Sequence, residues 1–230
     1  NGTGTFLNNG TLTPTYAPSL ADILAGSVNL TLTATPIAPC GTNSVSVKVL
    51  SITRAPLVNA GPDASICGLT PFATSGATAS NASSYMWSSS GSGSFVNPTL
   101  LNATYMPGAG DLLSGSVTLT LSVNGNSPCA LPVTDALTLT VNNAPLVDAG
   151  SDGATCETTA FTVSTATASN YSTLLWTSSG SGILSNAGTL TPTYTPSHND
   201  ALNGTVILTL TATGTAPCTT TVNDQMQIVV

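Results

Sequence analysis

Residues 117–129 read VTLTLSVNGNSPC, and this stretch decides the fold. Apolar and polar residues alternate strictly over residues 117–123, which is the pattern of a β-strand with one buried face. After a loop rich in turn-forming residues, apolar residues return at every second position over residues 137–141. We therefore predict a long β-hairpin that carries Cys129 in its loop.

The same stretch occurs three times, as VNLTLTATPIAPC at residues 28–40 and as VILTLTATGTAPC at residues 206–218. An interval of 89 residues separates its cysteines, Cys40, Cys129 and Cys218, and also separates Cys67 from Cys156. A fixed period is the signature of a repeat protein. We therefore expect each 89-residue unit to be a domain, with the C-terminal part of a first unit at 1–52 and complete units at 53–141 and 142–230.

Shorter strand candidates precede the hairpin in each unit. In the second unit they lie near residues 64–67, 72–78, 84–88, 94–96 and 103–105, with Gly, Pro, Asn and Ser between them. No segment sustains a helical apolar pattern, although residues 109–114 leave room for one turn. About seven short strands per unit predict an all-β fold of tandem immunoglobulin-like β-sandwich domains.

The aromatic residues follow the same period. Trp87 and Trp176 lie where an immunoglobulin-like sandwich buries a large aromatic residue, so we expect both in the core. The alternative is an exposed tryptophan that stacks on a sugar. A repeated tyrosine stands two residues before a proline in each unit; these residues are Tyr16, Tyr105 and Tyr194. We expect them to be core aromatic residues that anchor a turn, with their hydroxyl groups bonded to the backbone.

Charge limits the partners. Charged residues make up only 5% of the chain, against about 25% in ordinary soluble proteins, and the formal net charge is −7. A nucleic-acid partner needs clustered Lys and Arg, so the composition argues against one. No apolar run approaches the roughly 20 residues that span a bilayer, so membrane insertion is not expected either.

The cysteines point to an oxidising compartment. Each complete unit carries two, and we expect each pair to form a bridge within its domain, Cys67 with Cys129 and Cys156 with Cys218. By the same spacing, the partner of Cys40 falls before residue 1. Two cysteines per unit do not complete a zinc shell. We therefore expect an extracellular location, and the cell surface is the location that the family resemblance described below implies.

Several aspartates recur at the 89-residue interval, and two roles are open for them. They are either calcium ligands that stiffen a rod or, as we favour, residues that cap turns. No other cofactor is predicted. The recurring positions are Asp63 with Asp152, Asp135 with Asp224, and Asp22 with Asp111 and Asp200.

No catalytic constellation is found in the sequence. The only histidine, His198, has Ala109 and Leu20 at its equivalent positions, and a base confined to one repeat is a poor candidate for catalysis. We therefore predict that the segment is not an enzyme.

Four motifs resemble a known group of repeats. They are AGPDASICG at residues 60–68, the strand around Trp87, TPTYTPS at residues 191–197, and the hairpin at residues 117–129. Together they resemble the PKD-like and immunoglobulin-like repeats of giant Bacteroidota surface proteins, including gliding-motility adhesins. The resemblance implies export by a type IX secretion system and display as a long filament or stalk.

Three functions are compatible with these observations. Repetition favours a structural stalk or filament of a large secreted adhesin, serving gliding motility or attachment, whose partners are neighbouring repeats and the secretion or motility machinery. The alternatives are an array of modules that bind surface polysaccharide, and a fibre subunit completed by strand addition from another chain.

Overall fold

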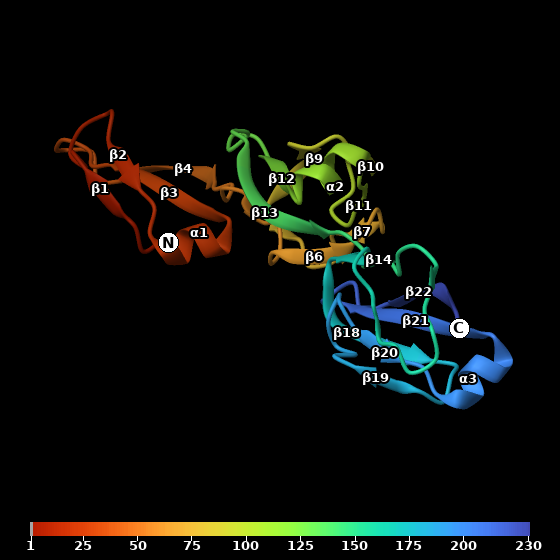
Figure 1. Ribbon diagram of the computed structural model, residues 1–230. Helices are drawn as coiled ribbons and strands as arrows, with labels where there is room; N and C mark the ends of the chain where they lie inside the picture. The colour runs from red at the N-terminus through yellow and green to blue at the C-terminus, as the bar shows by residue number, and fades with distance from the viewer. Residues whose placement is uncertain (1) are drawn as a thin grey trace.

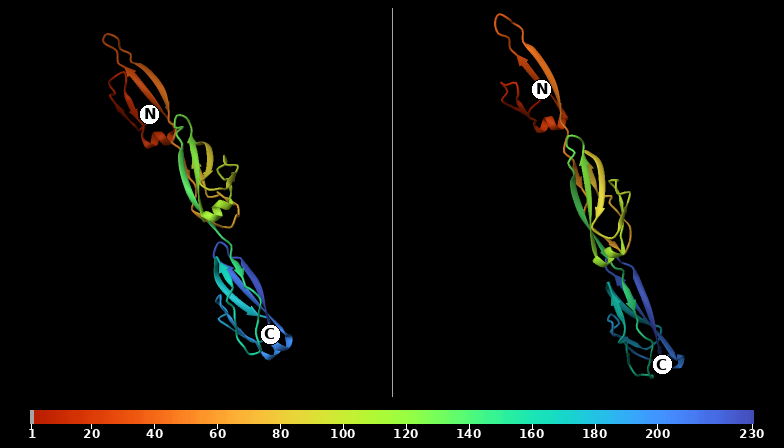
Figure 2. Two further views of the ribbon diagram at one scale, coloured as in Figure 1. Left: turned by 45° about the horizontal axis from the view of Figure 1, so that its top comes forward. Right: turned by 90° about the horizontal axis from the view of Figure 1, so that it is seen from above.

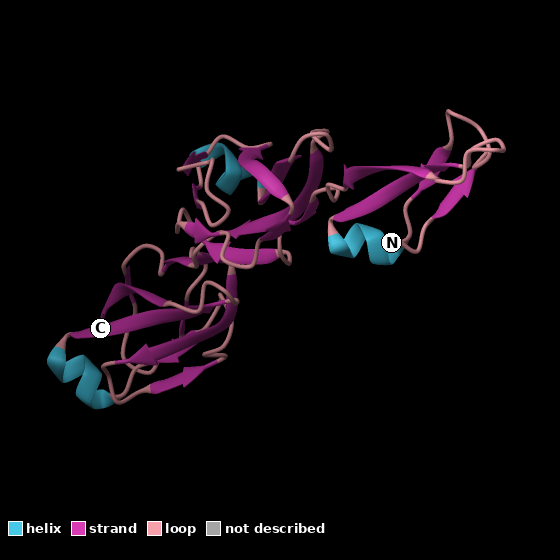
Figure 3. Ribbon diagram, turned by 180° about the vertical axis from the view of Figure 1, so that it is seen from behind, coloured by secondary structure: helices cyan, strands magenta, loops and turns pink. Residues whose placement is uncertain are grey.

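The computed structural model describes residues 2–230 as an elongated, mostly β molecule in three parts (Figure 1). We call these the N-terminal part, the middle sandwich and the C-terminal sandwich. Figure 2 shows them following one another along the molecule, and Figure 3 shows that each carries one short helix. In the middle and C-terminal sandwiches the helix lies at the end farther from the preceding part, and in the N-terminal part it lies at the end near the middle sandwich. None of the helices among residues 2–230 is long and apolar enough to cross a membrane.

The middle sandwich has two main sheets. One contains four strands in the order β6-β13-β12-β9, the other three strands in the order β10-β11-β7, and β5 pairs with β8. Its elements are β5 (Leu57–Asn59), β6 (Ala64–Cys67), β7 (Phe72–Ala73), β8 (Thr78–Ser80), β9 (Ala82–Ser89), β10 (Ser94–Val96), β11 (Thr104–Met106), α2 (Ala109–Ser114), β12 (Ser116–Gly125) and β13 (Val133–Asn142).

The predicted hairpin is confirmed. Strands β12 and β13 pair antiparallel from Ser116 opposite Thr140 to Val123 opposite Val133. Alternate residues of β12 point into the core, and Leu119, Leu121 and Val123 are fully buried there. The strict alternation in the sequence is therefore the alternation between the core and the outer face of this sheet.

The direction of the short strand β6 sets the polarity of the sandwich. Strand β6 pairs parallel to β13, with Ala64 opposite Leu139 and Cys67 opposite Asn142. Because parallel strands point the same way, the end of β6 lies at the end of the sandwich where the chain leaves. The β12–β13 loop, which contains Cys129, lies at the opposite end.

The C-terminal sandwich repeats this plan. Its four-stranded sheet has the order β15-β22-β21-β18 and its three-stranded sheet the order β16-β20-β19, with β14 paired to β17. Strand β15 again runs parallel to the last strand, β22. The elements are β14 (Leu146–Asp148), β15 (Gly153–Ala154), β16 (Phe161–Thr162), β17 (Thr167–Ser169), β18 (Tyr171–Ser178), β19 (Ile183–Ser185), β20 (Thr193–Thr195), α3 (His198–Asn203), β21 (Thr205–Gly214) and β22 (Thr221–Val229).

The N-terminal part contains two strand pairs and a helix. Strands β1 (Thr5–Leu7) and β2 (Thr15–Ala17) form one pair, β3 (Ser27–Ala34) and β4 (Ser44–Ser51) form the other, and α1 (Leu20–Ala25) lies between them in sequence. Leu32 is 53% exposed, whereas its equivalent Leu121 in the middle sandwich is buried. An open groove of about 780 Å³ runs between the two strand pairs.

The predicted all-β class and most of the predicted strands agree with the structure. The strand predicted near residues 72–78 is instead two short strands, β7 and β8, which belong to different strand pairs. Strand β5 was not predicted, because its three residues are too few to show an alternation. Residues 109–114 form the expected short helix, α2.

We predict that Leu121→Ala destabilises the middle sandwich by about 2–5 kcal/mol, because it removes a fully buried side chain and leaves a cavity. The measurement is urea unfolding followed by Trp87 fluorescence in a Trp176→Phe background. Leu131→Ala is the matched control, since Leu131 is 82% exposed and its truncation should change stability by less than about 0.5 kcal/mol. Equal effects of the two substitutions would contradict the assignment of Leu121 to the core.

Candidate functional site

The junction between the two sandwiches is the first candidate site. Strand β13 ends at Asn142 and β14 begins at Leu146, so only three residues connect the sandwiches. Cys67 lies beside this connection because β6 and β13 are parallel, and the next residue, Gly68, donates its N–H to the Asn142 carbonyl at 2.8 Å. Cys67, the last residue of β6, is thus held against the chain where it leaves the sandwich.

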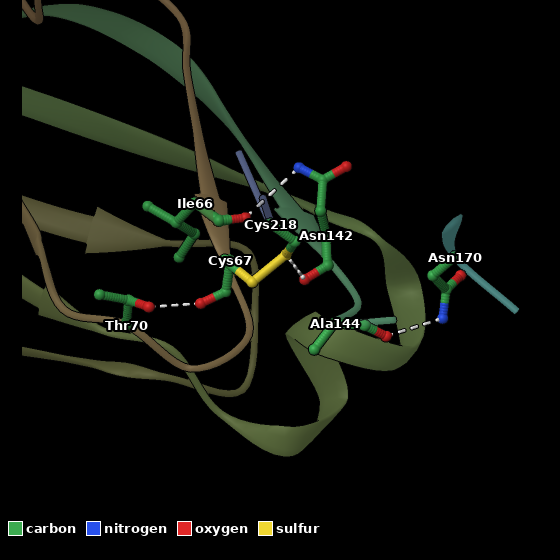
Figure 4. The surroundings of a disulfide bond; sticks show 7 residues. All are labelled: Ile66, Cys67, Thr70, Asn142, Ala144, Asn170 and Cys218. Atoms are coloured by element: carbon green, nitrogen blue, oxygen red, sulfur yellow. Dashed lines mark hydrogen bonds between the residues drawn. A yellow bond between two sulfur atoms is a disulfide. The ribbon is translucent and has the colours of Figure 1, made fainter. Parts of the chain in front are cut away.

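Cys218 reaches the same place from the other side. It lies in the loop between β21 and β22, at the end of the C-terminal sandwich that faces the middle one. Its sulfur is bonded to Cys67, with an S–S distance of 2.01 Å and a Cα–Cα distance of 5.0 Å (Figure 4). Cys218 is only 1% exposed. The bridge therefore joins two sandwiches across the connection.

This bridge corrects the expected pairing. Cys67 and Cys218 each form only one disulfide, so the bridges predicted within units, Cys67 with Cys129 and Cys156 with Cys218, are wrong. The reason is strand polarity. Cys67 and Cys129 lie at opposite ends of β13, whose ten residues span about 33 Å, whereas bonded cysteines have Cα atoms within about 7 Å. Cys40, Cys129 and Cys156 are free thiols in this structure.

Two asparagine side chains also close the junction. The Asn142 side chain donates to the Ile66 carbonyl at 3.3 Å, and the Asn170 side chain donates to the Ala144 carbonyl at 3.2 Å (Figure 4). Gly214 is required at its position, because a side chain there would collide with the Cys218 carbonyl and with the ring of Pro145. The loop that holds Cys218 thus packs directly on the connection.

A second recurring feature is a buried carboxylate next to each helix. In the middle sandwich, Asp111 accepts the Tyr105 hydroxyl at 2.7 Å and the backbone N–H groups of Ser92, Gly93 and Gly108 at 2.7–3.1 Å. Tyr105 is fully buried and Asp111 is 1% exposed. The carboxylate thereby ties the helix, the strand β11 and the loop before β10 together at one end of the sandwich.

Asp200 and Asp22 make the same contacts in the other two parts. Asp200 accepts the Tyr194 hydroxyl at 2.8 Å and the N–H groups of Ser181 and Ser197 at 2.8 Å. Asp22 accepts the hydroxyl of Tyr16 at 2.7 Å. Both aspartates also belong to capping boxes at the start of their helices.

Hydrogen bonds lower the pKa of the Asp200 carboxyl group. Burial alone raises the pKa of Asp200, but the N–H groups of Ser197 and Ser181 and the Tyr194 hydroxyl favour the charged form more strongly. The pKa of Asp200 therefore lies well below the usual value for an aspartate. Burial raises the pKa of Tyr194 in turn, as does its bond to the charged Asp200.

The other predicted aspartates each hold a backbone N–H group. Asp63 accepts from Thr138 and Asp152 from Gln227, both at 2.7 Å. Asp135 accepts from Ala60 and Asp224 from Ala149, both at 2.8 Å. Within residues 2–230, no group of three or more His, Cys, Asp or Glu side chains is placed to hold a metal ion.

The tryptophans are not placed to stack on a sugar. Trp87 is 3% exposed and its indole N–H donates to the Leu101 carbonyl at 3.0 Å. Trp176 is 1% exposed and its indole N–H donates to the Thr189 carbonyl at 3.0 Å. His198, the only histidine, forms an exposed pair with Glu157 at 2.9 Å.

Comparisons with known proteins concern the fold. No protein-family model matches the chain, and no curated protein sequence matches it. Its structure is similar to protocadherin gamma C5 EC1-3, at 11% identity, over 94% of this chain and 82% of that chain, with a TM-score of 0.51. It is also similar to the protocadherin gammaB4 extracellular domain, at 14% identity, over 100% of this chain and 43% of that chain, with a TM-score of 0.52. A third similar structure is human CDH23 EC21-23, at 14% identity, over 81% of this chain and 68% of that chain, with a TM-score of 0.51.

The chain has a cadherin-like β-sandwich fold. It spans less than half of the protocadherin gammaB4 chain that it matches. At these identities the similarity describes architecture, and the chemistry of the junction and of the carboxylate sites comes from the residues of this chain alone.

The pairing of each tyrosine with an aspartate was not recognised in the sequence. Tyrosine and aspartate stand six positions apart in all three parts, as Tyr16 and Asp22, Tyr105 and Asp111, and Tyr194 and Asp200. This constant separation, together with the shared 89-residue period, was the available signal. It was missed because the aspartates were considered only as calcium ligands or turn caps.

We predict that Asp200→Asn destabilises the C-terminal sandwich by about 2 kcal/mol or more at pH 7, because an amide NH₂ group would face backbone N–H donors. The folded pKa of Asp200 is depressed, so its contribution to stability is present above the unfolded pKa near 4 and is lost as the pH falls. The difference in the free energy of unfolding between wild type and Asp200→Asn should therefore become smaller below about pH 4. Denaturant unfolding followed by Trp176 fluorescence measures both effects.

Asp148→Asn is the matched control for this substitution. Asp148 accepts the Gly150 N–H at 2.7 Å, and in the middle sandwich Asn59 already makes the equivalent bond to Gly61 at 2.7 Å. The control should therefore leave stability unchanged. A loss as large as that of Asp200→Asn would show that loss of any aspartate charge destabilises the sandwich.

We predict that the oxidised chain contains the disulfide Cys67–Cys218. Peptide mapping without reduction should recover both cysteines in one cross-linked fragment, and Cys129→Ser should leave that fragment in place. Pepsin at acidic pH suits the experiment, because low pH suppresses thiol–disulfide exchange and the chain has only two basic residues for trypsin. A fragment that joins Cys67 to Cys129 would contradict the structure.

Proposed function

We propose that this chain is a non-enzymatic structural segment, a stalk or filament, of a large secreted cell-surface adhesin. In this proposal its domains are the 89-residue units, with boundaries at 1–52, 53–141 and 142–230. The observation that carries the proposal is the Cys67–Cys218 bridge, which fastens one sandwich to the next across a connection of three residues. A spacer needs such a link, because a short connection alone leaves two rigid bodies free to bend against each other.

The placement of the aromatic and acidic side chains supports a structural role. Both tryptophans are buried, as are Tyr105 and Tyr194, and Asp111 and Asp200 are occupied by hydrogen bonds within their own sandwich. The carbohydrate-binding alternative needs an exposed aromatic face, which neither Trp87 nor Trp176 provides.

The biological setting rests on the sequence. A disulfide requires an oxidising compartment, which supports an extracellular location. The resemblance to repeats of Bacteroidota surface proteins supports export by a type IX secretion system and a part in gliding motility or attachment. In that setting the partners are neighbouring repeats, surface polysaccharide reached by other regions of the adhesin, and the secretion or motility machinery.

Small-angle X-ray scattering tests the structural role. We predict a pair-distance distribution of a stiff, elongated particle for the oxidised chain. The double variant Cys67→Ser/Cys218→Ser should keep its circular dichroism spectrum but show a broader distribution, because the junction then relies on weak polar contacts. The control Cys129→Ser/Cys156→Ser removes two cysteines that form no disulfide in this structure and should scatter like the wild type. A flexible oxidised chain would contradict the proposal.

A further inference from the structure

Two unbonded cysteines occupy the same positions as the two bonded ones. Cys129 stands 89 residues before Cys218, in the same loop of the middle sandwich, and Cys156 stands 89 residues after Cys67, just beyond strand β15. Both are free thiols, with Cys156 exposed and Cys129 partly exposed. The question is whether their surroundings are also those of the bonded pair.

The loop around Cys129 already has the geometry of the bonded loop. The Cys129 N–H donates to the Asn126 carbonyl at 2.7 Å, as that of Cys218 donates to Thr215 at 2.8 Å. The Cys129 thiol donates to the carbonyl oxygen of Thr53 at 3.3 Å. In the bonded copy, the sulfur of Cys218 lies 3.5 Å from the carbonyl oxygen of Asn142, the equivalent of Thr53.

The packing behind this loop is repeated as well. A side chain at Gly125 would collide with the Cys129 carbonyl and the ring of Pro56, as one at Gly214 would with Cys218 and Pro145. Cys129 therefore lies at the end of the middle sandwich where the chain enters it. Cys218, which is bonded to Cys67, occupies the equivalent position in the C-terminal sandwich.

Cys156 is presented at the other face. Strand β15 is parallel to β22, and the Thr155 N–H donates to the Val229 carbonyl at 2.9 Å, so Cys156 follows the end of the last strand as Cys67 follows the end of β13. The turn after it also repeats, since the Thr159 N–H donates to the Cys156 carbonyl as the Thr70 N–H does to that of Cys67.

We propose that Cys129 and Cys156 are half-sites, by which we mean single cysteines placed to form the same kind of bridge as Cys67–Cys218. Each would bond a cysteine of another copy of the 89-residue unit. Cys129 takes the strand-end cysteine of a unit that precedes it, and Cys156 takes the loop cysteine of a unit that follows. Cys40 is a third half-site of the loop type, because its N–H donates to the Ile37 carbonyl at 3.2 Å in the same turn. Every junction between units is then closed by one disulfide.

Each new bridge forms by exchange with a small-molecule disulfide such as oxidised glutathione. The thiolate of one half-site attacks the oxidant, forms a mixed disulfide and releases one glutathione thiol. The thiolate of the second half-site then displaces the remaining glutathione. Two protein thiols are oxidised to one disulfide, and one oxidant disulfide is reduced to two thiols.

This arrangement makes the segment from Cys129 to Cys156 a covalent tie across both sandwiches. The segment runs along β13, through the connection and along β14 and β15. Its 27 steps reach at most about 90 Å, at roughly 3.4 Å per residue. With both ends bonded, unfolding of the remaining strands would add little length, because tension bypasses them.

The test uses the 230-residue chain followed by a second copy of its own residues 142–230, refolded with oxidised and reduced glutathione. The appended copy carries Cys156→Ser, so that it has no strand-end cysteine, and Thr219→Ser, so that the peptide with its position-218 cysteine differs in mass from the peptide with Cys218. Peptide mapping without reduction should find Cys156 joined to the position-218 cysteine of the appended copy. The Cys67–Cys218 bridge in the same molecule is the internal control for correct folding. A free Cys156, or Cys156 joined to Cys218, in a sample that contains Cys67–Cys218 would overturn the proposal.

Adding Cys156→Ser to the first 230 residues of this extended chain gives the matched control. It should leave the loop cysteine of the appended copy as one additional reactive thiol, while Cys67–Cys218 is unchanged. If the number of free thiols does not rise, that cysteine has another partner and the assignment is wrong. The scattering experiment on the unextended chain does not depend on this result, so failure of the half-sites can be distinguished from failure of the structural role.

Discussion

The parallel pairing of the short strand β6 with β13, the last strand of the middle sandwich, determines how the parts of this molecule connect. Because β6 runs in the same direction as β13, Cys67 lies where the chain leaves the middle sandwich, and the loop with Cys129 lies where the chain enters it. An antiparallel first strand would place both cysteines at one end and would favour a bridge inside the sandwich. The direction of the short strand β6 thus decides whether the disulfide lies within one sandwich or joins two sandwiches.

Stability within a sandwich has a separate origin. The apolar face of the β12–β13 hairpin fills the core, and the Asp111 carboxylate closes one end by collecting donors from the helix, a strand and a loop. This charge is buried at low cost because every hydrogen bond to it comes from a fixed group. The core and the carboxylate site recur in the C-terminal sandwich, so each sandwich holds itself together and the disulfide is left to join them.

The alternation of apolar and polar residues was sufficient to predict the hairpin, and the 89-residue period was sufficient to identify equivalent positions. Neither shows which strands become neighbours or in which direction they run, since both are set by packing between distant segments. Cys67 stands 62 residues before Cys129 and 151 residues before Cys218, and the period allows either pairing. The hydrogen bond between Tyr105 and Asp111 was also hidden, because Tyr105 lies in β11 and Asp111 in α2, and the period of neither element predicts a contact between them.

The weakness of the other junction contacts explains why a covalent bond is needed there. The hydrogen bond from Asn170 to the connection is worth about 1 kcal/mol and that from Asn142 to Ile66 lies within the middle sandwich, so neither fixes the angle between two rigid bodies. Ion pairs give no help, since the one found among residues 2–230, between His198 and Glu157, lies within the C-terminal sandwich. A junction of this composition is insensitive to salt. In the function that we propose, the stiffness of the junction depends on the redox state of the Cys67–Cys218 bond.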